Sequence, residues 1–355
     1  MRVVLVGGTG VVGGQAARIL RARHPSLGLI VAGRSLERAR ALAIDLKAEA
    51  VALDISERKP LAAIEGTIDA VAALVSDPDD YLLRDAIARG AAYVDIARGA
   101  AAQSRAYVVA SLLDVMAPVM FASNWMAGVP AILARKLTAE FADVDSVSID
   151  ILFFGTDKGG PDSQGVDETL SHPFATRTAG EWRFRPQMSD GKRVRFPSGV
   201  TRTAFAMNFA DQATVALSTG AKNAAIRLAL DSAFNSAAMR FIVHSGLWAA
   251  IQGPSFGWLR RALTHSPSKG GARHEFVVEV SGRLADGSAA RRNVDVLAPK
   301  GQSHLTAIGV VANLERVLGL QGPRLRPGVA VPETDADPDR LLALLKDEGV
   351  QVTMG

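Results

Sequence analysis

The stretch most informative about the fold is Val3-Val4-Leu5-Val6-Gly7-Gly8-Thr9-Gly10-Val11-Val12-Gly13. Its β-branched apolar run predicts a buried strand of a parallel sheet. The glycines that follow allow a tight turn, and they let bare backbone N–H groups approach a pyrophosphate at the N-terminus of a helix. We therefore predict a dinucleotide-binding loop made by Gly7, Gly8, Thr9, Gly10, Val11, Val12 and Gly13.

The spacing of these glycines fits two versions of the motif. Gly8, Gly10 and Gly13 satisfy G-x-G-x-x-G, whereas Gly7, Gly10 and Gly13 satisfy the wider G-x-x-G-x-x-G. The context supports the motif, because a strand precedes it and residues 15–23 have the apolar spacing of a helix. The alternative is a glycine-rich strand-to-helix turn that binds no ligand.

The end of the second predicted strand indicates which dinucleotide binds. Residues 29–32 run into Gly33-Arg34-Ser35, at the distance where a carboxylate would hold the ribose 2′-hydroxyl of NAD. No Asp or Glu stands there. Arg34 and Ser35, with Arg38 one turn further on, suit the 2′-phosphate of NADP better. The alternative is that these arginines are solvated charges at the start of a helix.

Composition excludes several other classes of protein. The chain has 355 residues, of which 48% are apolar, so it can bury a large core and is expected to form two domains. Its formal net charge of +4 comes from dispersed residues and does not call for a nucleic-acid partner. It has no cysteine, and its six histidines lack ligand spacing, so we expect no disulfide, no thiolate catalysis and no metal site. We expect no signal peptide and a cytoplasmic location. Residues 241–259 are uncharged, but Gln252, Gly253 and Pro254 interrupt them, which argues against a membrane span.

The first third of the chain alternates strand and helix, as a doubly wound sheet requires. Further strands are predicted at residues 50–53, 69–75, 91–96 and 118–122, and helices at 81–89 and 103–115. Because ligands bind at the carboxyl ends of such strands, the polar or crevice-lining candidates are Asp54, Val75, Ser76, Asp77, Asp95, Ser123 and Asn124. Among them, Asp54 and Ser76 are expected to contact the cofactor.

The pattern changes near residue 144. We predict a strand at residues 144–154, a hairpin that pairs residues 181–185 with 192–196 through Ser189-Asp190-Gly191, helices within 222–250, and strands at 276–280 and 291–297. Two further helices are predicted at residues 303–318 and 339–346. This second region is expected to be a mixed α/β domain.

Several segments together resemble the saccharopine dehydrogenase family of NADP-dependent reductases. They are GGTGVVG (Gly7 to Gly13), AGRS (Ala32 to Ser35), ARGAAYVDIA (Ala88 to Ala97), SNWMAGVPAILA (Ser123 to Ala134) and PGVAVPE (Pro327 to Glu333). The resemblance implies an α/β protein with an N-terminal Rossmann domain, residues 1–123, and a second mixed α/β domain, residues 124–303, that holds a small-molecule substrate and builds a homodimer. The C-terminal helices, residues 304–355, are expected to pack on the first domain.

The resemblance also implies an activity. Family members of known chemistry reduce an imine, formed between an amine and a carbonyl compound, with NADP(H) as the cofactor. Members commonly have a Pro-Gly pair where this chain has Ala127-Gly128-Val129-Pro130, which leaves the substrate open. Reduction of a C=C or C=O bond is an alternative. A dinucleotide-binding regulator that senses NADP(H) without turnover is another.

Asp95 and Asn124 are the candidate catalytic residues, because both follow crevice-side strand ends. Hydride transfer to an iminium carbon needs alignment and one proton rather than a nucleophile. Asp95 could instead cap the turn that follows it, and Asn124 and Trp125 could be structural. His172 is a weaker candidate for acid–base chemistry, and the arginines at 183, 185, 193 and 195 are weaker candidates for carboxylate binding, because a solvated surface position is the favoured interpretation for each.

Overall fold

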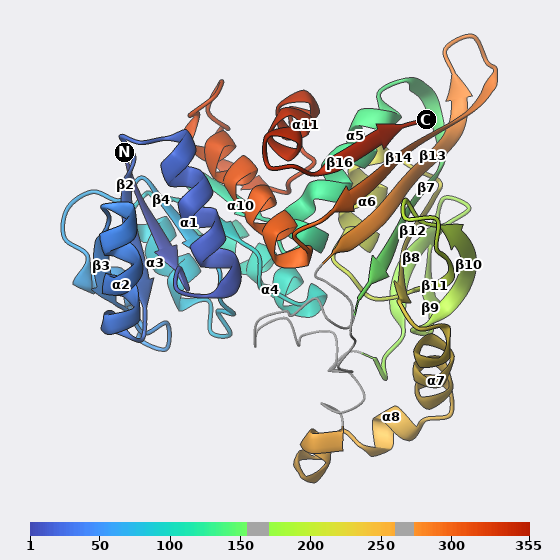
Figure 1. The fold of residues 1–355 in the computed structure, drawn as a ribbon, viewed down its shortest axis with the longest axis horizontal. Coiled ribbons are helices and arrows are strands. Elements are labelled where there is room, and N and C mark those ends of the chain that lie inside the picture. The colour runs from blue at the N-terminus through green and yellow to red at the C-terminus, as the bar shows by residue number, and fades with distance from the viewer. Residues whose placement is uncertain (155–169, 260–272) are drawn as a thin grey trace. The chain divides into compact units, whose positions relative to one another are not determined.

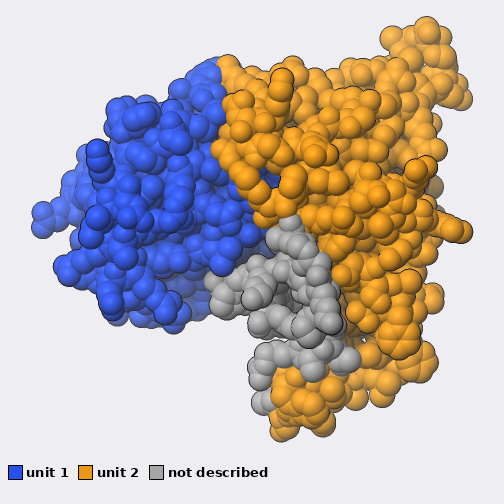
Figure 2. Space-filling model, in the orientation of Figure 1, with its two compact units in different colours: residues 1–129, 159–163, 303–335 blue, residues 130–158, 164–302, 336–355 orange. Residues whose placement is uncertain are grey.

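The computed structural model describes residues 1–154, 170–259 and 273–355, which divide into two compact units (Figures 1 and 2). Unit 1 contains residues 1–129 and 303–335. Unit 2 contains the other described residues. The last helix and the last strand of the chain therefore belong to unit 2. They are α11 (Pro338–Asp347) and β16 (Gln351–Met354).

Unit 1 is built on a seven-stranded sheet of order β3-β2-β1-β4-β5-β6-β15 in which every neighbouring pair is parallel. The strand order reverses between β1 and β4, and this switch point is where doubly wound sheets bind ligands. The strands are β1 (Arg2–Val6), β2 (Gly28–Gly33), β3 (Glu49–Ala52), β4 (Ala70–Ala73), β5 (Ala92–Asp95), β6 (Pro118–Phe121) and β15 (Gly328–Ala330).

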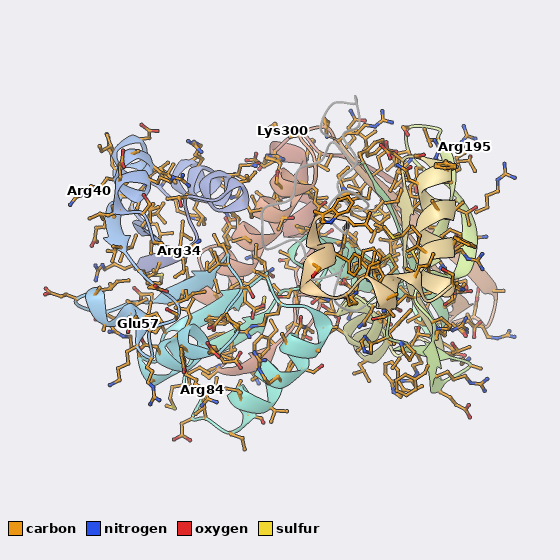
Figure 3. The ribbon with its side chains drawn as sticks, turned by 90° about the horizontal axis from the view of Figure 1, so that it is seen from below. Arg34, Arg40, Glu57, Arg84, Arg195 and Lys300 are labelled. Atoms are coloured by element: carbon orange, nitrogen blue, oxygen red, sulfur yellow. The ribbon has the colours of Figure 1, made fainter. Side chains whose placement is uncertain are left out.

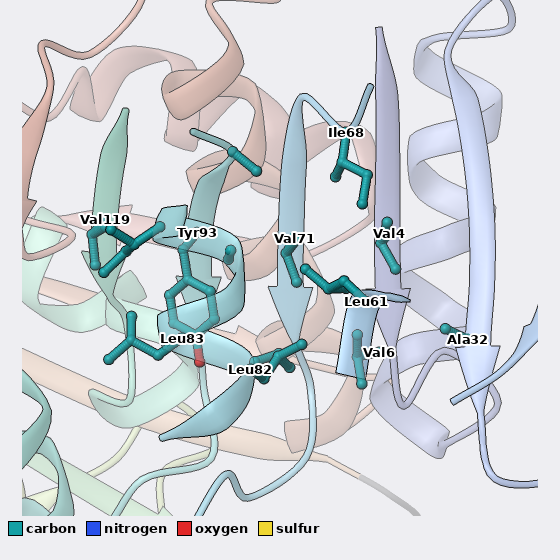
Figure 4. Packing of buried hydrophobic residues seen from close by; sticks show 14 of the residues in the cluster. Val4, Val6, Ala32, Leu61, Ile68, Val71, Leu82, Leu83, Tyr93 and Val119 are labelled. Carbon is teal, nitrogen blue, oxygen red and sulfur yellow. The ribbon is translucent and has the colours of Figure 1, made fainter. Parts of the chain in front are cut away.

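Helices cover both faces of this sheet, because successive residues of a buried strand point to opposite sides. The cluster on one face contains Val71, Leu82 and Tyr93 (Figure 4), and Ile30 belongs to it. Val31, the next residue of β2, packs against Ala39 of α2 on the other face. Each such apolar side chain stabilises the fold by about 1.5–3 kcal/mol when fully buried. The helices of unit 1 are α1 (Val11–Arg23), α2 (Leu36–Leu46), η1 (Pro60–Ala63), α3 (Tyr81–Ala88), α4 (Ala100–Ser111), η2 (Trp125–Gly128) and α10 (Gln302–Leu318). The predicted α/β fold with an N-terminal Rossmann-type sheet is confirmed.

Unit 2 contains a mixed seven-stranded sheet of order β10-β11-β12-β7-β13-β14-β16, in which β12 and β7 are parallel and the other pairs are antiparallel. A separate two-stranded sheet joins β8 and β9. The strands are β7 (Phe141–Phe153), β8 (Phe174–Thr178), β9 (Glu181–Arg185), β10 (Ser189–Arg195), β11 (Thr201–Ala206), β12 (Asn223–Leu230), β13 (His274–Leu284), β14 (Ala289–Ala298) and β16 (Gln351–Met354). Its helices are α5 (Val129–Thr138), α6 (Asp211–Thr219), α7 (Ala233–His244), α8 (Leu247–Ala250), η4 (Pro254–Phe256) and α11 (Pro338–Asp347). The predicted mixed second domain is confirmed.

Two local predictions for unit 2 are wrong. Strand β9 pairs with β8 across Ala179 and Gly180, and β10 pairs with β11, so the predicted hairpin between residues 181–185 and 192–196 does not form. Ala179 and Gly180 both have positive φ, 52° and 81°, as a two-residue hairpin turn requires. Residues 223–230 form β12 rather than a helix, because pairing with β7 overrides the helical preference of their Ala and Leu residues.

The uncharged stretch at residues 241–259 is divided among the end of α7, the short helix α8 and η4. Within the described part of the chain, no helix has the length and hydropathy needed to cross a membrane.

Candidate functional site

The glycine loop occupies the turn between β1 and α1, and its glycines have different roles. Gly7 has a φ of 82°, and a Cβ atom there would lie 2.6 Å from Cγ1 of Val75. The Gly7 N–H donates to the carbonyl of Ala32, and its carbonyl accepts from the N–H of Gly10. Gly7 therefore makes the tight turn possible and brings the loop against the end of β4.

Gly8 and Gly13 allow the loop and the helix to pack closely. A Cβ atom on Gly13 would lie 2.4 Å from the carbonyl oxygen of Gly7, and one on Gly8 would lie 2.9 Å from that of Leu5. Gly10 differs from them, because its only close neighbour would be the carbonyl of Gly7 at 3.2 Å and the residue is exposed. A side chain at position 10 would consequently extend into the space in front of the helix.

The N-terminus of α1 is free of acidic residues and of a side-chain cap. Gly10 is the N-cap, and the helix begins at Val11. The N–H groups of a helix's first turn lack intrahelical partners and carry the positive end of its dipole. Thr9, Gly10 and Val11 are exposed at this point. The loop thus fits a pyrophosphate. The supporting observation is the open space in front of the helix, into which a side chain at position 10 would extend.

The predicted 2′-phosphate residues gather at the ends of β2 and β3. Arg34 is exposed (Figure 3), and Ser35 caps α2 by accepting the Arg38 N–H at 3.3 Å. Asp54 accepts the backbone N–H of Ser56 at 2.9 Å and its hydroxyl at 2.8 Å. These hydrogen bonds lower the pKa of Asp54, and the nearby charge of Arg34 lowers it further. Arg34 and Asp54 are therefore electrostatic neighbours.

Ser76 follows β4 and is half-buried, one residue after Val75. Since Val75 is the side chain that a Cβ at Gly7 would meet, Ser76 lies next in the chain to the residue that packs on the glycine loop. The structure therefore brings Ser76 to the switch point between β1 and β4, with the loop, and brings Arg34, Ser35 and Asp54 together at the ends of β2 and β3.

On the other side of the switch point, the ends of β4 and β5 hold a buried acidic cluster around Arg98. The guanidinium donates from Nε to Oδ2 of Asp95 at 2.6 Å and from Nη2 to Oδ2 of Asp77 at 3.1 Å, and from Nη1 to Asp80. All four side chains are at most 4% exposed. Arg105 pairs with the second oxygen of Asp80 at 2.9 Å.

Burial raises the pKa of Asp95, against the opposing effects of Arg98 and of a hydrogen bond from Ser123. The pKa of Asp77 is raised for the same first cause, burial. Burial also holds the pKa of the Tyr93 phenol, which accepts from Arg98 at 3.3 Å, well above its ordinary value. Burial therefore favours the protonated forms of Asp77 and Asp95, although both carboxylates are paired with Arg98.

Ser123 connects this buried cluster to the end of β6. Its hydroxyl donates to Oδ1 of Asp95 at 2.6 Å and accepts the backbone N–H of Arg98 at 2.9 Å. Ser123 is half-buried, whereas Asp95 is only 1% exposed. The Asp95 carboxylate is thus covered by Arg98 and Ser123, and Ser123 is the more accessible end of the pair.

Asn124 is 5% exposed and starts a left-handed turn. Met126, Ala127 and Gly128 have φ values of 51°, 52° and 86°, and the Ala127 N–H donates to the Asn124 carbonyl at 3.1 Å. Helix α10 holds this turn through Asn313, whose side-chain amide donates to the Ala127 carbonyl at 2.9 Å. Left-handed non-glycine residues cost about 1–2 kcal/mol each, and such strain clusters at functional sites.

Three polar residues near this point were not predicted from the sequence. Tyr107, on α4, packs on Phe121 with ring centroids 4.6 Å apart. Burial raises the pKa of Tyr107, and the charges of Glu333 and Asp95 raise it further. Glu333 is fully buried and follows β15. Arg98 is the third. Two signals in the sequence were available. Glu333 is a carboxylate that ends the segment PGVAVPE, and Arg98 is an arginine three residues after Asp95.

The weaker candidates lie in unit 2, on its surface. His172 is exposed and contacts Ser171 at 3.3 Å. Arg183 pairs with Glu181 at 2.9 Å, and Arg193 and Arg195 are exposed on β10. Among the described residues, no group of three or more His, Asp or Glu side chains is arranged to hold a metal ion.

The comparisons with known proteins give one family-model match and several structural matches. Residues 3–116 match the family model described as the saccharopine dehydrogenase NADP binding domain. Apo saccharopine dehydrogenase (L-Glu forming) from Saccharomyces cerevisiae is 15% identical and has a TM-score of 0.67, with 100% of this chain and 99% of that chain covered. GenD2 from gentamicin A biosynthesis, in complex with NAD, is 13% identical over 100% of this chain and 96% of that chain, and its TM-score of 0.43 is too low to support an argument. None of the curated protein sequences matches the chain significantly.

Proposed function

We propose that this saccharopine dehydrogenase-like protein, an NADP-dependent oxidoreductase, reduces a small imine derived from an amino acid or another amine to a secondary amine. The acidic cluster at the ends of β4 and β5 is the observation that supports this substrate over the alternatives. Bound NADPH would supply the hydride. The residues of the chain must hold the cofactor, align the substrate and control one proton.

The cofactor would lie across the switch point. Its pyrophosphate fits the N-terminus of α1, and its 2′-phosphate fits Arg34 and Ser35, with Asp54 and Ser76 lining the same strand ends. This placement directs the nicotinamide toward the ends of β4, β5 and β6. We therefore retain Asp95 and Asn124 as the proposed residues of the reacting centre, with Ser123 added to them.

Charge favours a cationic substrate at this end of the sheet. Asp77, Asp80 and Asp95 outnumber the two guanidiniums of Arg98 and Arg105. An excess of negative charge stabilises a protonated imine and raises the pKa of its nitrogen, whereas it gives no such advantage to a neutral carbonyl or alkene. An imine is the better hydride acceptor when it is protonated.

The proton would come through Ser123. Its hydroxyl is the accessible group, and Asp95 behind it has a raised pKa and a direct hydrogen bond of 2.6 Å. Asp95 then acts as a positioning and charge-holding residue, while Ser123 and the Asn124 amide are the groups able to contact the substrate nitrogen. For this step Asp95 would be protonated on Oδ1 and the hydrogen bond would run in the opposite direction: the carboxyl group donates to Ser123 Oγ while the hydroxyl donates its proton to the imine nitrogen. Asp95 is then left as a carboxylate beside the iminium.

The regulatory alternative also has an observation in its favour. Every carboxylate of the cluster bound by Arg98 is already paired within unit 1, as a purely structural network would be. A protein that senses NADPH would bind the cofactor tightly and transfer no hydride.

Transfer of deuterium from labelled NADPH distinguishes the proposed imine reductase from the regulatory protein. The protein is incubated with NADPH deuterated at the transferable position, together with mixtures of small amines and carbonyl compounds. We expect one deuterium on carbon in a secondary amine, detected by mass spectrometry, and no labelled alcohol from the carbonyl compound alone. Labelled alcohol would favour the C=O reductase, and cofactor binding without label in any product would favour the regulator. The Gly10→Val variant serves as the control, because it should not bind the cofactor.

A further inference from the structure

A buried carboxylate lies beside an apolar cluster of the main sheet of unit 2. Glu275, on β13, stands opposite Leu152 of β7 and is fully buried. Leu152 belongs to a cluster of buried apolar side chains on this face, which also contains Phe154, Val194, Phe196 and Val277. A carboxylate in such surroundings is costly to bury unless hydrogen bonds and an opposite charge compensate for the lost water.

Glu275 has two partners among the residues that the structure describes. The backbone N–H of Ser198 donates to Oε2 at 2.9 Å. The Nε atom of Arg273 lies 3.2 Å from Oε1, although Oε1 accepts no hydrogen bond from the described residues. Arg273 therefore compensates for the charge of Glu275 by electrostatic attraction.

The guanidinium of Arg273 is also held by an aromatic ring. Its Cζ atom lies over the ring of Phe154, 4.6 Å from the ring centroid. Phe154 is 9% exposed, so the ring itself is fixed by the apolar cluster. A planar guanidinium that is stacked on a ring and paired with a buried carboxylate has lost much of its rotamer freedom before any ligand arrives.

The hydrogen-bonding capacity of Arg273 is unused in the described part of the chain. Its side chain is 40% exposed, and none of its N–H groups donates a hydrogen bond to a described residue. Arg227, on β12 of the same sheet, differs in this respect, because its nitrogen atoms all donate within the chain, to Asp190 and Ser148. An oriented guanidinium with free N–H groups can bind a carboxylate or a phosphate by two parallel hydrogen bonds.

We propose that Arg273 is the recognition residue of a binding site in unit 2 for a small organic carboxylate, with Phe154 and Glu275 holding its guanidinium in place. The charge of Glu275 favours a carboxylate over a phosphate at this position. A carboxylate brings one negative charge close to Glu275, whereas a phosphate monoester brings close to two at neutral pH and is repelled more strongly.

Titration of the full-length protein with three related probes, followed by ligand-observed NMR, tests the site. Benzoate carries the carboxylate, benzamide is its neutral analogue of the same shape, and phenyl phosphate carries the larger charge. We expect benzoate to bind, benzamide not to bind measurably, and phenyl phosphate to bind more weakly than benzoate. NADPH is left out, and all residues of the site belong to unit 2, so the result does not depend on the proposed hydride transfer.

Arg273→Gln should raise the dissociation constant of benzoate by about tenfold or more, the low end of the range for hydrogen bonds to charged groups. The matched control is Arg283→Gln, which removes an exposed arginine from the other end of β13 and should leave benzoate binding unchanged. Circular dichroism and NADPH binding check that both variants fold.

Two further variants test the orientation of the guanidinium. Arg273→Lys keeps a positive charge for Glu275, so it protects the fold, but it lacks the two parallel donors and should lose most of the benzoate affinity. Phe154→Leu removes the ring and should weaken benzoate binding by about two- to fivefold. The proposal is overturned if benzoate does not bind, if benzamide or phenyl phosphate binds as tightly, if Arg273→Gln, Arg273→Lys or Phe154→Leu keeps the full affinity, or if Arg283→Gln loses as much as Arg273→Gln.

Discussion

Arg34 and Asp54 place opposite charges at the ends of neighbouring strands. The hydrogen bonds from Ser56 lower the pKa of Asp54, so this carboxylate stays ionised at neutral pH and attracts Arg34. The 2′-phosphate of NADPH therefore competes with the Asp54 carboxylate for the Arg34 guanidinium. NADPH is preferred if Arg34 binds the phosphate more strongly, and a planar guanidinium can bind a phosphate with two parallel hydrogen bonds.

Replacing Arg34 with Ala should weaken NADPH binding by roughly 1.5–3 kcal/mol, the range for hydrogen bonds to charged groups, and should barely change NADH binding. Calorimetric titration of both cofactors measures the difference. Arg40→Ala, an exposed arginine of α2 (Figure 3), is the matched control and should leave both affinities unchanged. Equal losses for NADPH and NADH in Arg34→Ala would refute the phosphate assignment.

Asp95 and Asn124 are the proposed residues of the reacting centre. Asp95→Asn and Asn124→Ala should each lower turnover by about tenfold or more and leave NADPH binding nearly intact, because alignment at the reacting centre is lost while the cofactor contacts remain. Steady-state kinetics and calorimetry separate the two effects. Asp286→Asn, in an exposed turn of unit 2, controls for the loss of one carboxylate. Unchanged turnover in both site variants would exclude them from the reacting centre.

In the turn from β1 into α1, Gly10 is expected to matter for cofactor binding and Gly13 for the stability of the fold. Gly10→Val should abolish NADPH binding and lower the melting temperature less than Gly13→Ala does, because the residue is exposed and its Cβ would contact only the Gly7 carbonyl, at 3.2 Å. Gly13→Ala should lower the melting temperature, because its Cβ would lie 2.4 Å from the Gly7 carbonyl. Thermal denaturation with and without NADPH distinguishes the two. Wild-type affinity in Gly10→Val would show that the loop does not hold the pyrophosphate.

Helix α10 supports the left-handed turn through a glycine. A Cβ at Gly309 would lie 2.4 Å from the Met126 carbonyl, so Gly309→Ala should destabilise the protein by about 1–3 kcal/mol, although alanine is normally the better helix former. Gly14→Ala in α1 is the matched control, since its Cβ would meet only the flexible end of Arg18 within 3.4 Å. That variant should be as stable as the unmodified protein or more so. Urea denaturation of both variants gives the sign, and a stabilised Gly309→Ala would contradict the close packing.

The elements that the sequence predicted well are those with a local signal. Buried apolar runs located β1, β2, β4, β5 and β6, because parallel strands covered on both faces are apolar throughout. The edge strand β3 is half-exposed and was located from a shorter apolar run. Strand β15 was missed, since three residues are too few for a pattern. The hairpin in unit 2 was misplaced because Asp190-Gly191 is a familiar turn sequence, whereas the actual turn, Ala179-Gly180, carries a weaker signal.

For the whole molecule, the strand order determines which predicted residues meet. Strand ends could be predicted one by one, but the order that places β5 between β4 and β6 brings Asp77, Asp95 and Ser123 together. Arg98 then binds all three strand ends through its side chain and backbone. Such a cluster could not be derived from the chain alone, because its members are linked through the sheet and not through sequence spacing.

The charge of this cluster predicts a pH dependence of stability. Asp95 has a raised pKa in the folded protein, because burial disfavours its carboxylate more than Arg98 and Ser123 favour it, while the unfolded chain titrates at its ordinary value of 3.8. Between these two values the folded protein binds more protons than the unfolded chain, so this group's contribution to the free energy of unfolding falls as the pH rises. Tyr93, Asp77, Asp80 and Arg105 surround the same group and remain in the variant.

Asp95→Asn removes that titration, so the stability of the variant relative to the unmodified protein should increase as the pH rises from about 4 toward neutral. Urea denaturation of both proteins across this range measures the difference. Asp54→Asn is the control of opposite sign: Asp54 has a lowered pKa, so its contribution is present above 3.8 and is lost as the pH falls through its folded value. A stability difference for Asp95→Asn that stays constant with pH would mean that Asp95 keeps its charge throughout, and the proton that the proposed mechanism draws from it would have to come from elsewhere.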